Sequence, residues 1–179
     1  LSGVTVTLSQ IIVTAAIPNL VFTPAADANG AGYDNVKFTV NDGQADSAEQ
    51  TITLDVTAVN DAPTASDNTV TLNEDSSHTF AASEFGFSDI EGDSLTSVQV
   101  TELPTNGTLT LSSVVVTLNQ VIVTADIPSL VFTPAADANG TGYDNVKFTV
   151  NDSQADSAEQ TITLDVTGVN DAPTASDNT

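Results

Sequence analysis

The chain of 179 residues repeats itself with a period of 110 residues. Residues 1–69 align with residues 111–179 without a gap, and 60 of these 69 positions are identical. A period as long as one ordinary domain indicates a series of equivalent domains rather than a single large fold. The sequence therefore predicts tandem repeats that are joined head to tail.

The sequence contains one complete repeat and parts of two others. Residues 60–169 form the complete repeat, and residues 1–59 correspond to 111–169, which is the second half of a repeat. Residues 170–179 match 60–69 and are expected to start the next repeat. A half repeat leaves an apolar face uncovered, so we expect residues 1–59 to be completed by a longer polypeptide or by another copy.

Apolar and polar residues alternate with a period of two along the complete repeat, which is typical of strands with one buried face. No segment has a long helical period, and turn residues such as Asn106–Gly107 and Asn139–Gly140 separate the short runs. These features predict an all-β fold, a seven-stranded Greek-key sandwich of the Ig-like kind, with Tyr143 as a tyrosine corner. The strands are expected at 70–73, 78–82, 95–101, 108–118 with a break, 121–124 together with 130–133, 145–150 and 159–167.

Strands that alternate in direction place the loops of this sandwich at two ends. We name them the leading end, where the chain arrives at Asn60, and the trailing end, where it departs after residue 167. Loops 83–94 and 151–158 are expected at the leading end, and Glu74, Asp75 and loop 135–144 at the trailing end. Successive repeats are then joined through Val-Asn-Asp-Ala-Pro, in which the proline restricts the backbone.

The charge of the chain excludes several classes of partner. It has 24 acidic residues against two lysines and no arginine, so its formal net charge is -22. Nucleic acid and anionic membrane surfaces repel such a chain, and no apolar run is long enough for membrane insertion. Cysteine is absent, which excludes disulfides and thiolate metal sites. Because 40% of the residues are hydrophobic, we expect a folded core rather than disorder.

The acidic residues gather at the two predicted ends of the repeat. They are Asp67, Asp89, Glu91, Asp93 and Asp152 with Asn60, Asp61 and Asn151 at the leading end, and Glu74, Asp75, Asp137, Asn139 and Asp144 at the trailing end. Carboxylates so close repel one another, and Ca²⁺ takes 6 to 8 oxygen ligands, whereas Mg²⁺ needs a stricter octahedron. We therefore expect calcium sites, the alternative being that these acids only solvate the surface.

Four motifs, taken in their order, resemble the cadherin-like tandem repeats of large secreted bacterial adhesins of the RTX or biofilm type. They are the linker 59–63, the acidic loop 89–93, and the segments 130–134 and 148–152. The resemblance covers the whole chain. It implies a calcium-dependent sandwich at the bacterial cell surface or in the extracellular medium, with calcium between neighbouring repeats.

The resemblance also implies a set of metal ligands. These are Asn60, Asp61, Asn170 and Asp171 in the linkers, Asp89, Glu91 and Asp93 in the acidic loop, Glu74 near the first strand, and Asp27 and Asp137 in the loop of the trailing end. With Asp152 added from the leading-end cluster, we expect Asp61, Asp89, Asp93 and Asp152 to be the principal ligands of one or two ions.

The function expected from these features is that of a calcium-rigidified extender in a surface adhesin, supporting adhesion or biofilm formation. Its partners are neighbouring repeats of the same chain. The alternative is that the repeat itself binds a polysaccharide or another copy. We expect no enzyme, because His78 is the sole histidine and duplicated end loops suit a spacer better than an active site. Phe85, Phe87 and Phe132 are expected in the core rather than in a recognition pocket.

Overall fold

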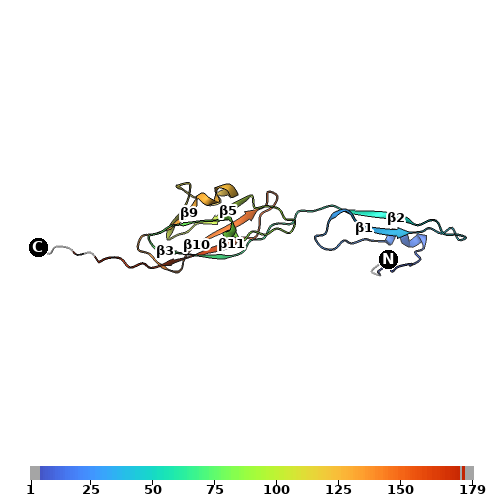
Figure 1. The fold of residues 1–179 in the computed structure, drawn as a ribbon, viewed down its shortest axis with the longest axis horizontal. Coiled ribbons are helices and arrows are strands. Elements are labelled where there is room, and N and C mark those ends of the chain that lie inside the picture. Colours follow the sequence, from blue (N-terminus) through green and yellow to red (C-terminus); the bar gives the residue numbers. More distant parts are fainter. Residues whose placement is uncertain (1–4, 174, 176–179) are drawn as a thin grey trace. The chain divides into compact units, whose positions relative to one another are not determined.

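The computed structural model of the chain describes residues 5–173 and residue 175. It separates into two compact units, Leu1–Val59 (unit 1) and Asn60–Thr179 (unit 2), which are described individually (Figure 1). The prediction that residues 170–179 start a further repeat falls in part on residues 174 and 176–179, which lie outside the described residues. No helix among the described residues is long and apolar enough to cross a membrane.

Unit 2 is a sandwich of two β-sheets, as the sequence predicts (Figure 1). The strand order is β3-β11-β10-β5-β8 in one sheet and β4-β9-β6-β7 in the other. Successive strands cross repeatedly between the two sheets, which is the Greek-key character of such domains. The strands are β3 (Asn68–Asn73), β4 (His78–Thr79), β5 (Ser97–Glu102), β6 (Gly107–Leu111), β7 (Val114–Val115), β8 (Val121–Val123), β9 (Leu130–Pro134), β10 (Gly140–Asn151) and β11 (Gln160–Thr167).

Two predicted strands of unit 2 are divided, so that its described residues form nine strands instead of seven. The break expected within 108–118 lies at Ser112 and Ser113, which both have positive φ and separate β6 from β7. A 3-10 helix, η3 (Thr124–Ser129), contains Pro128 and separates β8 from β9. Another, η2 (Ala82–Phe85), follows β4. Strand β10 begins five residues earlier than the pattern predicts, because its first part pairs with β11 across a bulge.

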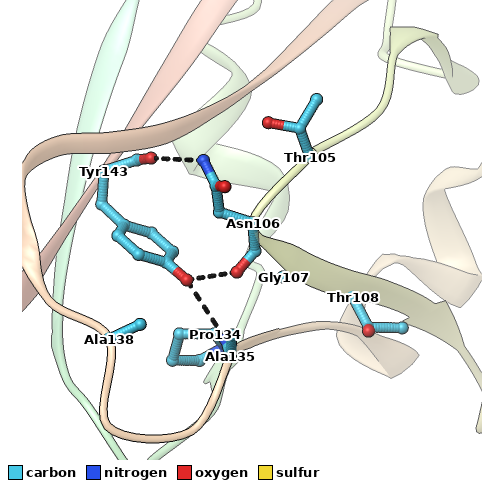
Figure 2. Close-up of a pocket in the computed structure, with 8 residues that line it drawn as sticks. All are labelled: Thr105, Asn106, Gly107, Thr108, Pro134, Ala135, Ala138 and Tyr143. Atoms are coloured by element: carbon cyan, nitrogen blue, oxygen red, sulfur yellow. Dashed lines mark hydrogen bonds between the residues drawn. The ribbon is translucent and has the colours of Figure 1, made fainter.

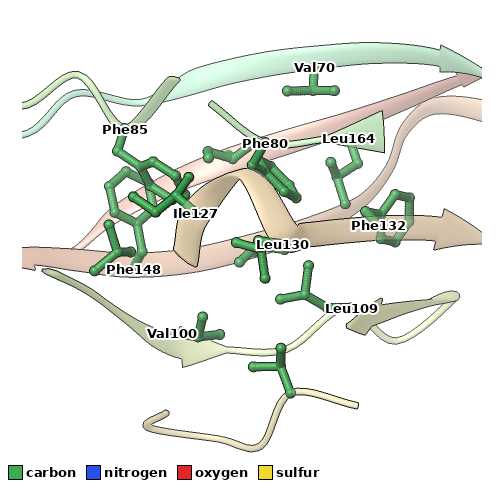
Figure 3. Packing of buried hydrophobic residues seen from close by; sticks show 14 of the residues in the cluster. Val70, Phe80, Phe85, Val100, Leu109, Ile127, Leu130, Phe132, Phe148 and Leu164 are labelled. Carbon is green, nitrogen blue, oxygen red and sulfur yellow. The ribbon is translucent and has the colours of Figure 1, made fainter. Parts of the chain in front are cut away.

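The core of unit 2 lies between the two sheets, where each strand turns its apolar face inward. Strands β10 and β11 bury every second residue, including Phe148 and Ile162, which are fully buried. The ring of Phe85 meets that of Phe148 edge to face, with the ring centroids 4.9 Å apart (Figure 3). Phe132 is also fully buried and Phe87 packs against the core, so the prediction that these aromatic residues are core residues is confirmed.

Unit 1 contains the same hairpin without the rest of the sandwich. Strands β1 (Gly30–Phe38) and β2 (Gln50–Val56) form an antiparallel pair, preceded by the 3-10 helix η1 (Thr14–Asn19). Their register and bulge reproduce those of β10 and β11, as the near-identical sequence requires. Within the part of unit 1 that the structure describes, β1 and β2 pair with no third strand.

The loops of unit 2 lie at the two ends that the sequence predicts. At the leading end, Thr64 and Ser88 exchange backbone hydrogen bonds of 2.7 and 2.9 Å, which joins the linker to loop 83–94. At the trailing end, the backbone N–H of Glu74 donates to the carbonyl of Thr167 over 2.9 Å, so the turn after β3 lies beside the end of β11. The alternating strand directions therefore bring acidic loops from distant parts of the sequence together.

Candidate metal centres

The leading end of unit 2 joins the linker to two acidic loops. The side-chain amide of Asn60 donates to Asp152 Oδ2 over 3.1 Å, and Gln154 Nε2 donates to Asn60 Oδ1 over 2.7 Å. The backbone N–H of Asp61 donates to Glu91 Oε2 over 3.3 Å. Asn60 and Asp61 therefore lie against both loop 83–94 and loop 151–158.

Asp152 anchors the loop that follows β10. Its side chain is buried, and Oδ1 accepts the backbone N–H groups of Gln154 (2.6 Å) and Ala155 (2.7 Å). These backbone donors, followed by the amide of Asn60, lower the pKa of Asp152 despite the burial. The carboxylate is thus ionised and already well supplied with donors, so its first role is to fix the loop.

Asp89 has an unusual oxygen. Its Oδ1 accepts the backbone N–H of Asp93 over 2.9 Å, but its Oδ2 is withdrawn from solvent and has no hydrogen-bond partner. Buried acceptors without a donor are rare, and a bound ion is one of the groups that satisfies them. Burial raises the pKa of the neighbouring Glu91, and the charges of Asp61 and Asp89 raise it further. The leading end therefore has a surplus of negative charge and a carboxylate oxygen, Asp89 Oδ2, that accepts no hydrogen bond.

At the trailing end, Glu74 ties three segments together. It is buried, its Oε2 accepts from Asn139 Nδ2 over 2.7 Å, and its Oε1 accepts the backbone N–H of Val169 over 2.6 Å. The hydrogen bond from Asn139, and then that from Val169, lower the pKa of Glu74. Glu74 thereby holds the outgoing linker against the loop between β9 and β10.

Three exposed carboxylates meet beside Glu74. One carboxylate oxygen from each of Asp75, Asp137 and Asp171 lies within 4.8 Å of those of the other two. Asp75 and Asp137 both have positive φ (63° and 57°), which turns their loops sharply and which Asp tolerates better than most residues. The charge of Asp137 is the main cause that raises the pKa of Asp171, followed by burial and the charges of Asp75 and Glu74. Nothing else at this end neutralises these three charges among the described residues.

The structure brings most of the predicted ligands together in two separate groups. Asn60, Asp61, Asp89, Glu91, Asp93 and Asp152 lie at the leading end, and Glu74, Asp137, Asn170 and Asp171 at the trailing end. Among the described residues, the trailing end supplies the one set of three acidic ligand atoms within 4.8 Å, although the principal ligands were expected at the leading end. Asn170 Nδ2 donates to the carbonyl of Asp171 over 3.0 Å, as Asn60 Nδ2 does to the carbonyl of Asp61 over 2.8 Å.

For three acidic residues, the structure differs from the sequence-based expectation. Asp75 is expected at the trailing end but not among the metal ligands, although its position in a turn directly after Glu74 could have indicated that it joins them. Asp144, expected among the acids of the trailing end, is buried and accepts backbone N–H groups of Thr105, Asn106 and Asn145, so it caps a loop. Asp27, the counterpart of Asp137, is exposed in unit 1, and residues 1–59 contain no counterpart of Asp75.

Tyr143 closes the trailing end as the predicted tyrosine corner. Its hydroxyl donates to the carbonyl of Asn106 and accepts the backbone N–H of Ala135 (Figure 2). The Asn106 side chain donates in turn to the carbonyl of Tyr143 over 3.2 Å. An open pocket of about 480 Å³ lies beside these groups, and Tyr143 and Asn106, which line it, join the two loops through their hydrogen bonds.

Comparison with known proteins agrees with this architecture. No curated protein and no solved structure matches the chain. The family described as bacterial Ig domain matches residues 1–55 and residues 60–165, one match in each unit. With most of its length matched and a two-sheet sandwich in the complete repeat, the chain belongs to the bacterial Ig domain family.

Proposed function

We propose that the chain is a calcium-binding structural repeat of a bacterial surface adhesin of the RTX or biofilm type, and that it is not an enzyme. Domains of its family are usually structural modules of surface or extracellular proteins. In this proposal, calcium fixes the linker onto the end of each sandwich, so that the series of repeats holds a distal binding domain away from the cell. Its role is mechanical.

The observation that carries the proposal is the meeting of Asp75, Asp137 and Asp171. Two oxygens bound on opposite sides of one Ca²⁺, at about 2.4 Å each, lie about 4.8 Å apart. Three carboxylate oxygens within 4.8 Å of one another therefore have the spacing of ligands to one ion. The set is all oxygen and strongly negative, which suits a hard divalent cation, and backbone carbonyls and water would complete the shell.

A calcium ion at this position would join three parts of the protein. Asp75 belongs to the turn after β3, Asp137 to the loop before β10, and Asp171 to the linker after β11. Holding Asp171 on the two loops restricts the linker where Glu74 already fixes Val169. With free calcium about 100-fold above its dissociation constant, one such site adds about 2.7 kcal/mol to the free energy of unfolding.

The leading end supports a second site. Asp89 Oδ2, which has no donor, lies in the loop that contains Glu91 and Asp93, and Asp61 approaches this loop from the linker. These residues do not bring three ligand atoms within 4.8 Å among the described residues, so binding there requires a small movement of the loop. We assign this site lower calcium affinity than the site at the trailing end.

The test is thermal unfolding of the full 179-residue chain with calcium, with chelator, and with magnesium at matched ionic strength. Calcium should raise the melting temperature by several degrees, and magnesium should raise it much less. Asp137→Asn should abolish most of the calcium effect. The double substitution Asp89→Ala with Asp93→Ala should remove the smaller remaining part.

A charge control separates specific binding from general screening. Asp126→Ala also removes one negative charge, and the first copy of the repeat already has Ala16 at this position, so the variant should respond to calcium like the parent chain. Equal melting temperatures in calcium, magnesium and chelator would refute the calcium site. The acids would then only solvate the two ends of the sandwich.

The second candidate function is direct binding of another copy. Residues 103–125 contain no charged residue, and within them Val114, Val115, Leu118, Val121 and Val123 are exposed. An uncharged apolar edge is where two chains of net charge -22 approach with the least repulsion. Sedimentation of the chain against a Val115→Lys, Leu118→Lys variant tests this: a dimer that is lost in the variant supports homophilic binding, and a monomeric parent chain rules it out.

A further inference from the structure

Tension along the chain reaches unit 2 through two linkers at opposite ends of the sandwich. The chain arrives at the leading end and departs at the trailing end (Figure 1). β3 is the first strand after the incoming linker, and β11 is the last strand before the outgoing linker. A pull on the two linkers therefore acts on these two strands before it acts on any strand between them in the sequence.

The two strands that receive the pull are parallel neighbours in one sheet. Six residue pairs join them, from Asn68 with Ile162 to Asn73 with Thr167. The incoming linker pulls β3 toward the leading end, and the outgoing linker pulls β11 toward the trailing end, so the strands must slide past each other to separate. Because the hydrogen bonds of a parallel pair are evenly spaced, sliding loads the whole ladder at once rather than one bond after another.

Contacts at both ends extend this pair beyond its ladder. At the leading end, the backbone N–H of Thr161 donates to Asp67 Oδ1 over 2.8 Å. At the trailing end, Glu74 accepts the backbone N–H of Val169 over 2.6 Å, and its own N–H donates to the carbonyl of Thr167 over 2.9 Å. Each of these contacts joins a residue next to β3 to a residue in or next to β11, so each opposes the same sliding movement.

The side chains of β3 oppose sliding as well. Val70 and Leu72 lie in the core, with exposed fractions of 4% and 8%, whereas Thr69 and Thr71 are exposed. A slip by one residue would exchange the two faces, placing threonine in the core and the apolar side chains in water. β3 must therefore move by two residues, about 6.6 Å, before its side chains match the core again.

We propose that β3 and β11 form a mechanical clamp, the pair of strands that carries tension between the linkers of the repeat. β3 is an edge strand that pairs only with β11 among the described residues, so its release opens one side of the core. The remaining strands then unfold at a lower force. The clamp consists of protein groups alone, and it is therefore independent of the proposed calcium site.

The test stretches single molecules of the full 179-residue chain in chelator, along two directions. Attachment at the chain ends slides β3 along β11. Attachment through Ser66→Cys and Glu159→Cys, two exposed positions at the leading end, instead peels the strands apart from that end. The chain has no natural cysteine, so these thiols define the attachment points. The unfolding step of unit 2 is identified by its length, because about 100 residues extend to about 330 to 360 Å.

Peeling should need a force lower by about twofold or more than sliding at the same loading rate, because the bonds of the ladder then break in turn. Equal forces in the two directions would overturn the proposal.

Two buried valines separate mechanical resistance from global stability. Val70 in β3 and Val100 in β5 are 4% and 1% exposed, so substitution by alanine removes the same groups from one core. Val70→Ala should lower the force needed for sliding. Val100→Ala should lower the urea midpoint by a similar amount but change the sliding force much less, because β5 adjoins neither linker. An equal loss of force in both variants would show that force follows global stability, and the clamp would be refuted.

Discussion

Asp152 contacts the incoming linker of unit 2 and Asp171 lies in the outgoing linker, and their surroundings shift their pKa values in opposite directions. Backbone N–H donors around Asp152 lower its pKa, whereas the charge of Asp137 raises that of Asp171. A lowered pKa means that ionisation stabilises the fold, and this contribution is lost as the pH falls through the lowered pKa. A raised pKa means that protonation stabilises the fold, and this contribution is lost as the pH rises through the raised pKa.

These two aspartates therefore make a matched pair for substitution without calcium. At neutral pH, Asp152→Asn should lower the melting temperature by several degrees. The side-chain NH₂ group of the new Asn would face an N–H donor that now meets a carboxylate oxygen of Asp152. Asp171→Asn should raise the melting temperature slightly, because repulsion from Asp137 and Asp75 disappears. Thermal unfolding in chelator at several pH values checks this, and the Asp171→Asn effect should vanish in acid, where the parent side chain is protonated. A fall in stability for both variants at neutral pH would contradict the opposite shifts.

The same reasoning gives calcium binding a pH dependence. In the proposed calcium site, protons compete with calcium for Asp171, so the calcium-induced rise in melting temperature should shrink as the pH falls through the raised pKa of this residue. Asp171→Asn should show little calcium response at any pH. A calcium effect that stays constant from neutral pH into the acid range would place the ion elsewhere.

Gly107 shows how closely a single residue is fitted. A Cβ at this position would lie 2.4 Å from Phe132 Cε2 and 2.8 Å from the carbonyl oxygen of Thr133. Gly107→Ala should therefore lower the free energy of unfolding by about 1 to 3 kcal/mol through overpacking. Gly168→Ala is the control, because its Cβ would meet only Asn139 at 3.3 Å and the first copy already has Ala58 there. Urea unfolding of both variants measures the difference, and equal unfolding midpoints would show that β6 and β9 move apart at little cost to accommodate the added methyl group.

At the scale of elements, the two hairpins place a nearly identical sequence in two environments. Phe148 of β10 is fully buried, and Phe38 of β1 is exposed by more than a third. Phe148→Ala should reduce the free energy of unfolding of unit 2 by about 3 to 5 kcal/mol. Phe38→Ala should leave the main unfolding transition in place. Urea unfolding followed by circular dichroism checks this pair, and equal effects would show that the side chain of Phe38 is buried as deeply as that of Phe148.

The strands were predictable from sequence where one face of a strand is buried and the other is exposed to solvent. β10 and β11 follow strict alternation, and their pattern was sufficient to predict them. β7 and β8 lie within the segments predicted as strands, 108–118 and 121–124, although alternation carries little information there, because the residues on both faces around Val114, Val121 and Val123 are apolar and several are exposed. A break within 108–118 was also predicted, but its position at Ser112 and Ser113 depends on two non-glycine residues with positive φ.

The candidate sites were predictable only in part, and for a related reason. Strand direction alone assigned each acidic loop to the correct end, so Glu74 and Asp137 were expected together. The sequence does not show which carboxylates converge. Convergence depends on the backbone turns at Asp75 and Asp137, and on hydrogen bonds that already occupy the oxygens of other carboxylates. Asp144 and Asp152 look like ligands in the sequence, but backbone N–H groups take up their oxygens.

At the scale of the whole molecule, the two hairpins of the 179-residue chain should differ in stability although their sequences are nearly identical. Amides of β10 and β11 should exchange slowly, at rates set by global unfolding of unit 2, because these strands are paired on both sides and cover a core. Amides of β1 and β2 should exchange orders of magnitude faster, because their hairpin has no core of its own. Hydrogen exchange followed by mass spectrometry measures both in one experiment, and similar protection in the two hairpins would contradict this difference.

The 110-residue period has a consequence for how such a protein is made. A ribosome delivers residues 60–110 after residues 1–59 and before residues 111–169, so a nascent first half meets the second half of the preceding repeat before its own partner exists. The two candidate partners differ at 9 of 59 positions, and side-chain chemistry distinguishes them poorly. Near-identical neighbours of this kind are prone to mispairing.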